Sequence, residues 1–186
     1  MLNRRSIRIK VLQHIYSFGH NVRLIEDVES LKSSTLVNLR NSITNIDTYY
    51  IRVIVIALNF QEIENKKKAL NKKNQLTFNL SQNKILELLK KKAAINNEMV
   101  SFNSTLSSEL ELFKDWYKLL KREAFFQAYY KKDNPSIEED IEFIKDLIFT
   151  FILKNEDINS FFESRNIYWD IDKQIIRSML KKSLGS

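Results

Sequence analysis

The sequence predicts an all-α fold: a helical bundle of about seven to eight helices, including a long helix near residues 35–65. Two observations support this class. The 186 residues contain two glycines and one proline, whereas sheet-rich folds need many of both in their turns. Apolar residues also recur at alternating spacings of three and four over most of the chain, which is the period of one helix face.

The first helix is predicted to begin at Asn3, a good N-cap, and to run to Phe18, with Gly19 as its stop. A shorter second helix is expected over about residues 22–32. The apolar face of the first helix, which should pack against other helices, is expected to comprise Ile7, Val11, Ile15 and Phe18.

The long helix begins at Leu36 and carries one continuous apolar stripe. Its members are Leu36, Leu39, Ile43, Ile46, Tyr50, Val53, Ala57 and Phe60. The four β-branched residues 53–56 alone would suit a strand, but the unbroken spacing on both sides favours a helix. Residues 66–79 are polar and are predicted to be a loop or a fraying helix end. A short helix is expected over 81–91, with Ser81 as its cap.

The second half of the chain is predicted to hold a long helix over about 106–130, followed by a clear break at 131–135. Ser136 and Glu139 form a capping box for the next helix, and shorter helices are expected near 158–162 and 170–180. We expect residues 1–132, with the basic first helix, and the acidic residues 133–186 to pack in one bundle as a single domain.

The net charge of +7 is unevenly distributed along the chain. Residues 1–40 carry +4, residues 66–92 carry +8 and residues 133–172 carry −8. Clustered positive charge favours a polyanionic partner, nucleic acid before membrane. The lysine run at 66–73 has a simpler alternative interpretation, as the solvated end of a helix.

Residue types needed for catalysis are scarce. There is no cysteine, and the two glycines cannot form a phosphate-binding loop. The two histidines, His14 and His20, lack metal-site spacing, and we expect His14 to be structural. Acidic residues 138–142 suit a helix N-terminus, and the aromatic residues of 116–130 suit a core. The sequence therefore predicts a non-enzymatic protein with no metal or organic cofactor.

The first helix is the strongest candidate site. Its first three turns hold Arg4, Arg5, Arg8 and Lys10 with no acidic residue. Guanidinium groups match phosphate geometry, and an amide or aromatic ring further along the helix can contact bases. The candidate RNA-binding residues are Arg4, Arg5, Arg8, Lys10, Gln13 and Tyr16.

This segment resembles the start of NusB-type transcription antitermination factors, whose first helix has the pattern Arg-Arg-x-x-Arg-x-x-x-x-Gln-x-x-Tyr. Here the pattern is matched by Arg4, Arg5, Arg8, Gln13 and Tyr16. The stretches 133–153 and 164–170 are in turn similar to the lineage-specific helical region of Bacteroidetes-type NusB-like proteins. The family's C-terminal helical half would follow about where this chain stops, and we expect it to be lacking.

The resemblance implies an all-helical factor that binds boxA-like RNA of the ribosomal RNA leader. A cytoplasmic location is expected because the sequence shows no apolar run long enough to span a membrane and no signal-peptide pattern at its start. The resemblance also implies a NusE-type ribosomal protein and the RNA polymerase complex as partners, although the missing half puts NusE-type binding in question. Carried over by position, the three arginines would contact phosphates, Gln13 a polar base edge and Tyr16 a base face. The alternative is a protein–protein interaction scaffold, with the Leu36–Phe60 stripe as a homodimer seam. Membrane attachment is disfavoured because the first helix has no tryptophan.

Overall fold

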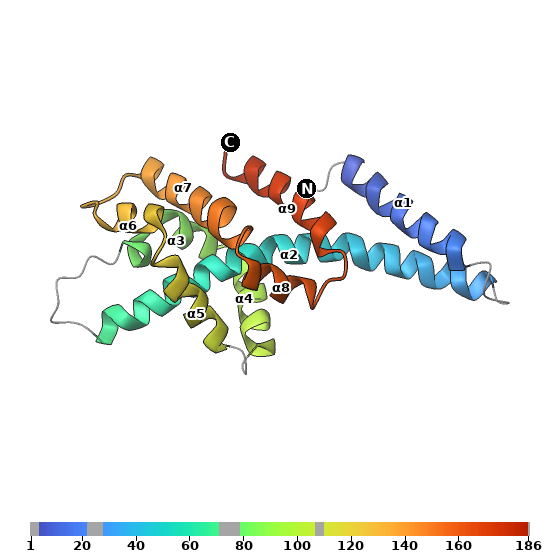
Figure 1. Cartoon of the computed structure of the whole chain (residues 1–186), viewed down its shortest axis with the longest axis horizontal. Helices are drawn as coiled ribbons and strands as arrows, with labels where there is room; N and C mark the ends of the chain where they lie inside the picture. The colour runs from blue at the N-terminus through green and yellow to red at the C-terminus, as the bar shows by residue number, and fades with distance from the viewer. Residues whose placement is uncertain (1–3, 22–27, 71–78, 107–109, 186) are drawn as a thin grey trace. The chain divides into compact units, whose positions relative to one another are not determined.

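The structure is a computed structural model that describes residues 4–21, 28–70, 79–106 and 110–185. These ranges contain helices and turns without a strand, which confirms the all-α class, and their nine α-helices exceed the seven to eight expected (Figure 1). None of the described helices is long and apolar enough to cross a bilayer. In chain order, the elements are α1 (Arg4–Asn21), α2 (Val28–Leu70), η2 (Leu80–Gln82), α3 (Lys84–Lys90), α4 (Ala93–Thr105), α5 (Leu110–Leu120), α6 (Ala124–Tyr130), α7 (Ile137–Asp146), η4 (Leu147–Ile152), α8 (Glu156–Glu163) and α9 (Trp169–Ser183).

The chain divides into two compact units. Unit 1 comprises Met1–Tyr50 and Ile171–Ser186, and unit 2 comprises Ile51–Asp170. α6 and α7, which lie on either side of residue 132, pack together inside unit 2: the rings of Tyr129 and Phe143 stack with centroids 4.0 Å apart.

Helices α1 and α2 are both longer than the sequence suggested. α1 continues through Gly19 to Asn21, because an exposed glycine inside a helix costs about 1 kcal/mol and does not have to end it. α2 is one helix of 43 residues, where two were expected. The hydroxyls of Ser34 and Thr35 donate to the Leu31 carbonyl within the helix. Part of the expected second helix, residues 22–27, lies outside the described residues.

The helix that follows η2 is capped by Asn83, so the prediction of a Ser81 cap is wrong. The Asn83 side-chain oxygen accepts from the backbone N–H groups of Ile85 and Leu86, at 3.1 and 3.0 Å. Ser81 instead lies within η2, and its own N–H donates to a Glu64 carboxylate oxygen at 2.7 Å. Asparagine is as good an N-cap as serine. Because Ser81 is held in η2 by its hydrogen bond to Glu64, Asn83 is the residue that caps α3.

The helix predicted over 106–130 is two helices, α5 and α6, with a break at 121–123. At the break the backbone tightens, and the N–H of Arg122 bonds to the carbonyl three residues earlier, at Leu119. The turn redirects the chain so that Phe126 and Tyr129 pack on Phe143 of α7. Burial of this aromatic cluster therefore overrides the continuous local spacing.

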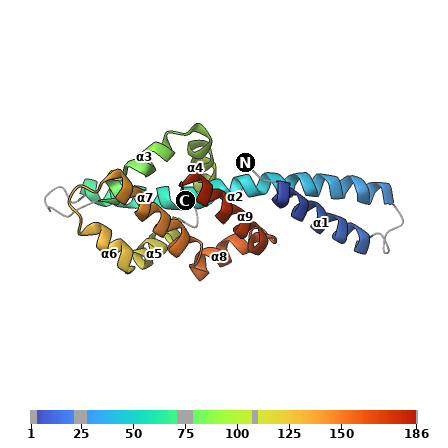
Figure 2. The same ribbon diagram turned by 90° about the horizontal axis from the view of Figure 1, so that it is seen from above.

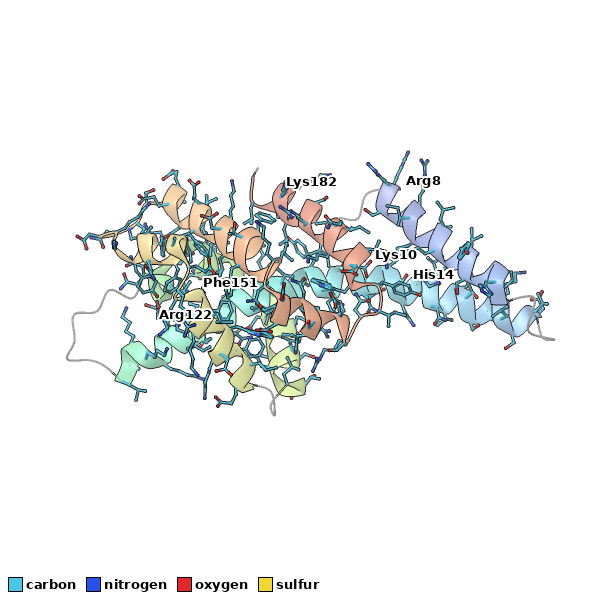
Figure 3. The ribbon with its side chains drawn as sticks, viewed as in Figure 1. Arg8, Lys10, His14, Arg122, Phe151 and Lys182 are labelled. Carbon is cyan, nitrogen blue, oxygen red and sulfur yellow. The ribbon has the colours of Figure 1, made fainter. Side chains whose placement is uncertain are left out.

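The predicted capping box at the start of α7 is confirmed. The Ser136 Oγ accepts from the Glu139 N–H, and a Glu139 carboxylate oxygen accepts from the Ser136 N–H. α7 leads into the π-helical segment η4, whose widened turn is marked by a bond from the Leu153 N–H to the Ile148 carbonyl, five residues back. This segment is largely buried, and Phe151 contacts Phe60 of α2 edge-on with ring centroids 6.2 Å apart (Figure 3).

The core of unit 2 surrounds the second half of α2. Every residue from Val53 to Gln61 is buried, which is the pattern of a helix enclosed on all sides. In the turned view, α3 and α4 lie on one side of α2, and α5, α6 and α8 lie on the other (Figure 2). α7 packs against α3, because the Lys84 N–H donates to the Asp140 carboxylate. The aromatic residues of 116–130 are largely in this core, as predicted: Trp116, Tyr117, Phe126 and Tyr129 are buried, and Phe125 and Tyr130 are half-buried.

Candidate nucleic-acid interface

The packing face of α1 is polar. The buried side chains of this helix are Ser6, Lys10 and His14, spaced four residues apart along one stripe. α1 lies beside the first half of α2 in unit 1 (Figures 1 and 2). The N-terminal helix is therefore anchored largely through hydrogen-bonding and charged groups.

Lys10 is the middle residue of this buried stripe, so it is not one of the exposed cations of α1. Its side chain is 0% exposed, and its Nζ lies 2.6 Å from Oδ1 of Asp172 on α9, which is 1% exposed. The prediction of Lys10 as an RNA contact is thus corrected, because a buried ammonium held by a carboxylate cannot reach a phosphate outside. No local pattern in the sequence predicts this pairing, since the two residues are far apart in the chain.

His14 lies one turn beyond Lys10 and is structural, as predicted. It is 6% exposed, and its Nε2 lies 3.1 Å from the Ser42 hydroxyl of α2. Burial, together with the positive charge of Lys10, lowers the pKa of His14 below its ordinary value. The lowered pKa favours the neutral imidazole, which suits a hydrogen bond to a hydroxyl.

The outward side of α1 carries most of the predicted site. Arg4, Arg5 and Arg8 are exposed, and Tyr16 is 79% exposed. Arg8 points away from the neighbouring helices in Figure 3. Gln13 is half-buried, and its Oε1 is shielded from solvent. The structure thus leaves the three arginines and the tyrosine accessible on one helix.

The apolar stripe expected to bury α1 is not its packing face. Ile15 is 60% exposed and Ile7 39% exposed, and Val11 and Phe18 are half-buried. The pairing of Lys10 with Asp172 and of His14 with Ser42 sets the rotation of the helix about its axis. The Ile7–Phe18 stripe is consequently turned aside and stays partly in water.

Most of the net charge of the chain belongs to unit 1. Its residues include eleven basic and five acidic side chains, a net of +6, whereas unit 2 has nineteen basic and eighteen acidic side chains. On α9, Lys181 and Lys182 are exposed and add to the positive charge of this unit (Figure 3). A field of this sign attracts polyanions.

The lysine run at 66–73 is only partly described. Lys66, Lys67 and Lys68 lie near the end of α2, which runs to Leu70, and residues 71–73 lie outside the described residues. The Lys67 ammonium lies over the Tyr117 ring, 4.5 Å from its centroid, and the Lys68 ammonium donates to the Ser81 hydroxyl at 3.4 Å. These contacts give Lys67 and Lys68 structural roles within unit 2.

A buried carboxylate in unit 2, Glu64, was not predicted. It is 1% exposed, and its two oxygens accept from the Tyr117 hydroxyl at 2.8 Å and from the Ser81 N–H at 2.7 Å. Burial raises its pKa to about 7. The sequence does contain a sign of this burial, because Glu64 falls four residues after Phe60 and so continues the apolar stripe of the long helix. Its hydrogen bonds tie α2 to η2 and α5, which is a structural role.

The expectation that residues 138–142 serve a helix terminus holds for Glu138 and Glu139, which lie in the first turn of α7. Asp140 has a further role, since it is buried. It accepts from the Tyr129 hydroxyl at 2.5 Å and from the Lys84 N–H at 2.9 Å, and so joins α7 to α6 and α3.

The long stripe on α2 packs mainly within the chain. Four of its members are 0% exposed and so cannot form a seam with a second copy: Ile46, Val53, Ala57 and Phe60. Leu36, at the other end of the stripe, is 60% exposed. The homodimer seam is therefore reduced to the first turns of the predicted stripe.

Comparison with known proteins gives no match to this chain among protein-family models, curated proteins or solved structures.

Proposed function

We propose that this protein is an RNA-binding transcription termination and antitermination factor of NusB type, and that its RNA contact is the outward side of α1. The observation that carries the proposal is the accessibility of Arg4, Arg5, Arg8 and Tyr16 on a helix whose opposite side is anchored by Lys10 and His14. The resemblance of the same residues to the NusB pattern supports it.

Each side chain has a defined role in this proposal. The three guanidinium groups contact successive phosphates, and their forked donors favour two hydrogen bonds to each phosphate. The Tyr16 ring stacks on an unpaired base, as aromatic side chains do in single-stranded RNA recognition. Gln13 contributes a polar contact at the edge of the site. A NusE-type ribosomal protein and the RNA polymerase complex are the proposed partners of the RNA-bound form.

The dependence of affinity on salt tests the phosphate contacts. Each neutralised phosphate on single-stranded RNA contributes about −0.7 to the slope of log association constant against log salt concentration. Three arginines give a slope of about −2, and the buried Lys10 contributes nothing. Replacing Arg4, Arg5 and Arg8 together with glutamine should nearly abolish the slope and weaken binding to every RNA sequence alike. Fluorescence anisotropy with a boxA-like oligonucleotide over a salt series measures both quantities.

A matched control separates this site from the general charge of the protein. Lys91, Lys131 and Lys154 are exposed residues of unit 2, and replacing them with glutamine removes the same charge. This control should keep the parent slope. Tyr16→Ala should weaken binding by about 1–3 kcal/mol without changing the slope. Equal effects of the two triple variants, with helical circular dichroism retained, would exclude α1 as the RNA surface.

A further inference from the structure

A groove with a volume of about 620 Å³ lies between α5 and α8 in unit 2. These two helices lie side by side in both ribbon views (Figures 1 and 2). The apolar part of the groove is formed by Leu112, Trp116 and Leu119 from α5 and Phe161 from α8. None of these residues belongs to the proposed RNA site, so the groove requires its own explanation.

The apolar floor of the groove is preformed. The rings of Trp116 and Phe161 meet edge to face, with centroids 5.3 Å apart and planes at 78°. Both rings are anchored in the core, at 3% and 6% exposed, and Leu112 beside them is 38% exposed. Rings buried to this degree cannot offer a full face to a nucleic-acid base, but they do give a fixed apolar surface to a side chain that enters the groove.

The rim of the groove has a net positive charge. Lys118 and Asp115 neutralise each other, with Nζ and Oδ1 2.8 Å apart. The remaining charged residues are Arg122, Arg165 and Asp157. Beside that pair, the lining thus has two guanidinium groups and one carboxylate, Asp157, which is in the first turn of α8, where the helix dipole favours an acidic residue.

The Arg165 guanidinium is held at the groove by its neighbours. It lies over the Phe161 ring, 4.0 Å from the centroid, and its Nη1 donates to the Phe161 carbonyl at 3.2 Å. Arg122 is exposed and follows the last turn of α5 (Figure 3). One guanidinium is therefore fixed and the other can adjust to an approaching anion.

We propose that this groove docks an acidic amphipathic helix of a protein partner. Tryptophan and arginine are among the residue types enriched in protein–protein hot spots, and this groove has Trp116 in its floor and Arg122 and Arg165 on its rim. A helix lying between two helices presents apolar anchors at i, i+3 or i+4, and i+7, which would contact Trp116, Leu119 and Phe161. Acidic residues flanking those anchors would pair with Arg122 and Arg165, because the rim carries an excess of positive charge.

The groove contains one of the two tryptophans of the chain, Trp116, and the other is Trp169. In a Trp169→Phe background the emission therefore reports on the groove. The probe is an amidated helical peptide of about four turns, with leucines at i, i+3, i+4 and i+7 and glutamates on the flanks. Its matched control has lysines in place of the glutamates. We expect the acidic peptide to shift the Trp116 emission and to bind at least about tenfold more tightly than the basic one.

Charge exchange on the protein tests the role of the rim. Arg122→Glu should weaken the acidic peptide about tenfold and improve binding of the basic peptide. Variants of Arg4, Arg5 and Arg8 should bind the acidic peptide as the parent does, so failure here is distinguishable from failure of the RNA proposal. Because Trp169 donates to Asn159 at 3.0 Å in the core, the parent chain labelled with 5-fluorotryptophan provides a second measurement that needs no substitution.

Three outcomes would overturn the proposal. One is that neither peptide perturbs Trp116 at about 100 μM, a concentration that detects weak peptide complexes. Another is equal binding of the acidic and basic peptides, which would show a non-specific apolar contact. The last is a Trp116 response to single-stranded RNA and not to the acidic peptide, which would make the groove a nucleic-acid surface.

Discussion

The ammonium of Lys10 lies 2.6 Å from the carboxylate of Asp172, and both side chains are fully enclosed in unit 1. This ion pair connects α1, near the start of the chain, to α9, near its end. An arginine-rich helix that presents its cations outward needs an anchor on its opposite side. Here a cation of the same helix, turned inward, is part of that anchor.

Removing one member of the pair should destabilise unit 1 strongly. Lys10→Met leaves the Asp172 carboxylate buried without its cation, and we expect a loss of about 3–5 kcal/mol in the free energy of unfolding. The double variant Lys10→Met with Asp172→Leu should lose less than Lys10→Met alone, since no buried charge remains. Hydrogen exchange of the α1 amides measures the stability of both variants. A double variant that loses as much stability as Lys10→Met, or more, would show that the two residues are not coupled.

The stability of unit 2 should depend on pH through Glu64. Its pKa is raised from 4.5 to about 7 in the folded chain, so the folded state binds the proton more tightly. The contribution of Glu64 to the free energy of unfolding should therefore be complete below about pH 4.5, decrease by about 3 kcal/mol as pH rises through 7, and be lost above that. Denaturant titrations followed by tryptophan fluorescence report on this unit, because Trp116 and Trp169 both belong to it.

Glu64→Gln should remove most of this pH dependence. The neutral amide still accepts from Tyr117 but has one oxygen in place of two, so the hydrogen bond from Ser81 is lost at every pH. The variant should have a lower free energy of unfolding than the parent at pH 5, and this difference should become smaller above pH 7. Glu111→Gln, a change at an exposed carboxylate of α5, is the control. An unchanged pH profile in Glu64→Gln would refute the assignment.

The Tyr129 hydroxyl should be worth more than a surface hydroxyl. It accepts from the Asn83 side chain at 3.0 Å and donates to Asp140 at 2.5 Å, and burial raises its pKa above the ordinary value. Tyr129→Phe keeps the stacking on Phe143 but deprives two buried groups of a partner. We expect a loss of about 1–3 kcal/mol in urea denaturation. A loss within the experimental error would mean that the network relaxes without cost.

The capping box of α7 predicts a smaller effect. Ser136→Ala removes the acceptor for the Glu139 N–H and should cost about 1 kcal/mol. Ser136→Asp keeps an acceptor at the same position and should restore the stability. Thermal unfolding followed by circular dichroism compares the three proteins, and equal midpoints for alanine and serine would show that the box does not contribute.

The sequence by itself determined the all-α class, the capping box at Ser136 and the core role of the aromatic cluster. These features depend on residues close together in the chain, where spacing and side-chain chemistry act locally. It also placed three arginines and a tyrosine on one helix, and their exposure agrees with the structure.

The tertiary structure alone decided which side of α1 faces inward. Local periodicity favoured the Ile7–Phe18 stripe, but Asp172, over 160 positions after Lys10, and Ser42 of α2 supply partners for Lys10 and His14. The same holds for the break between α5 and α6 and for the burial of Glu64, which depend on Phe143 and on Tyr117. A polar group can be buried where a distant residue satisfies its charge or hydrogen bonds, and no local pattern encodes that partner.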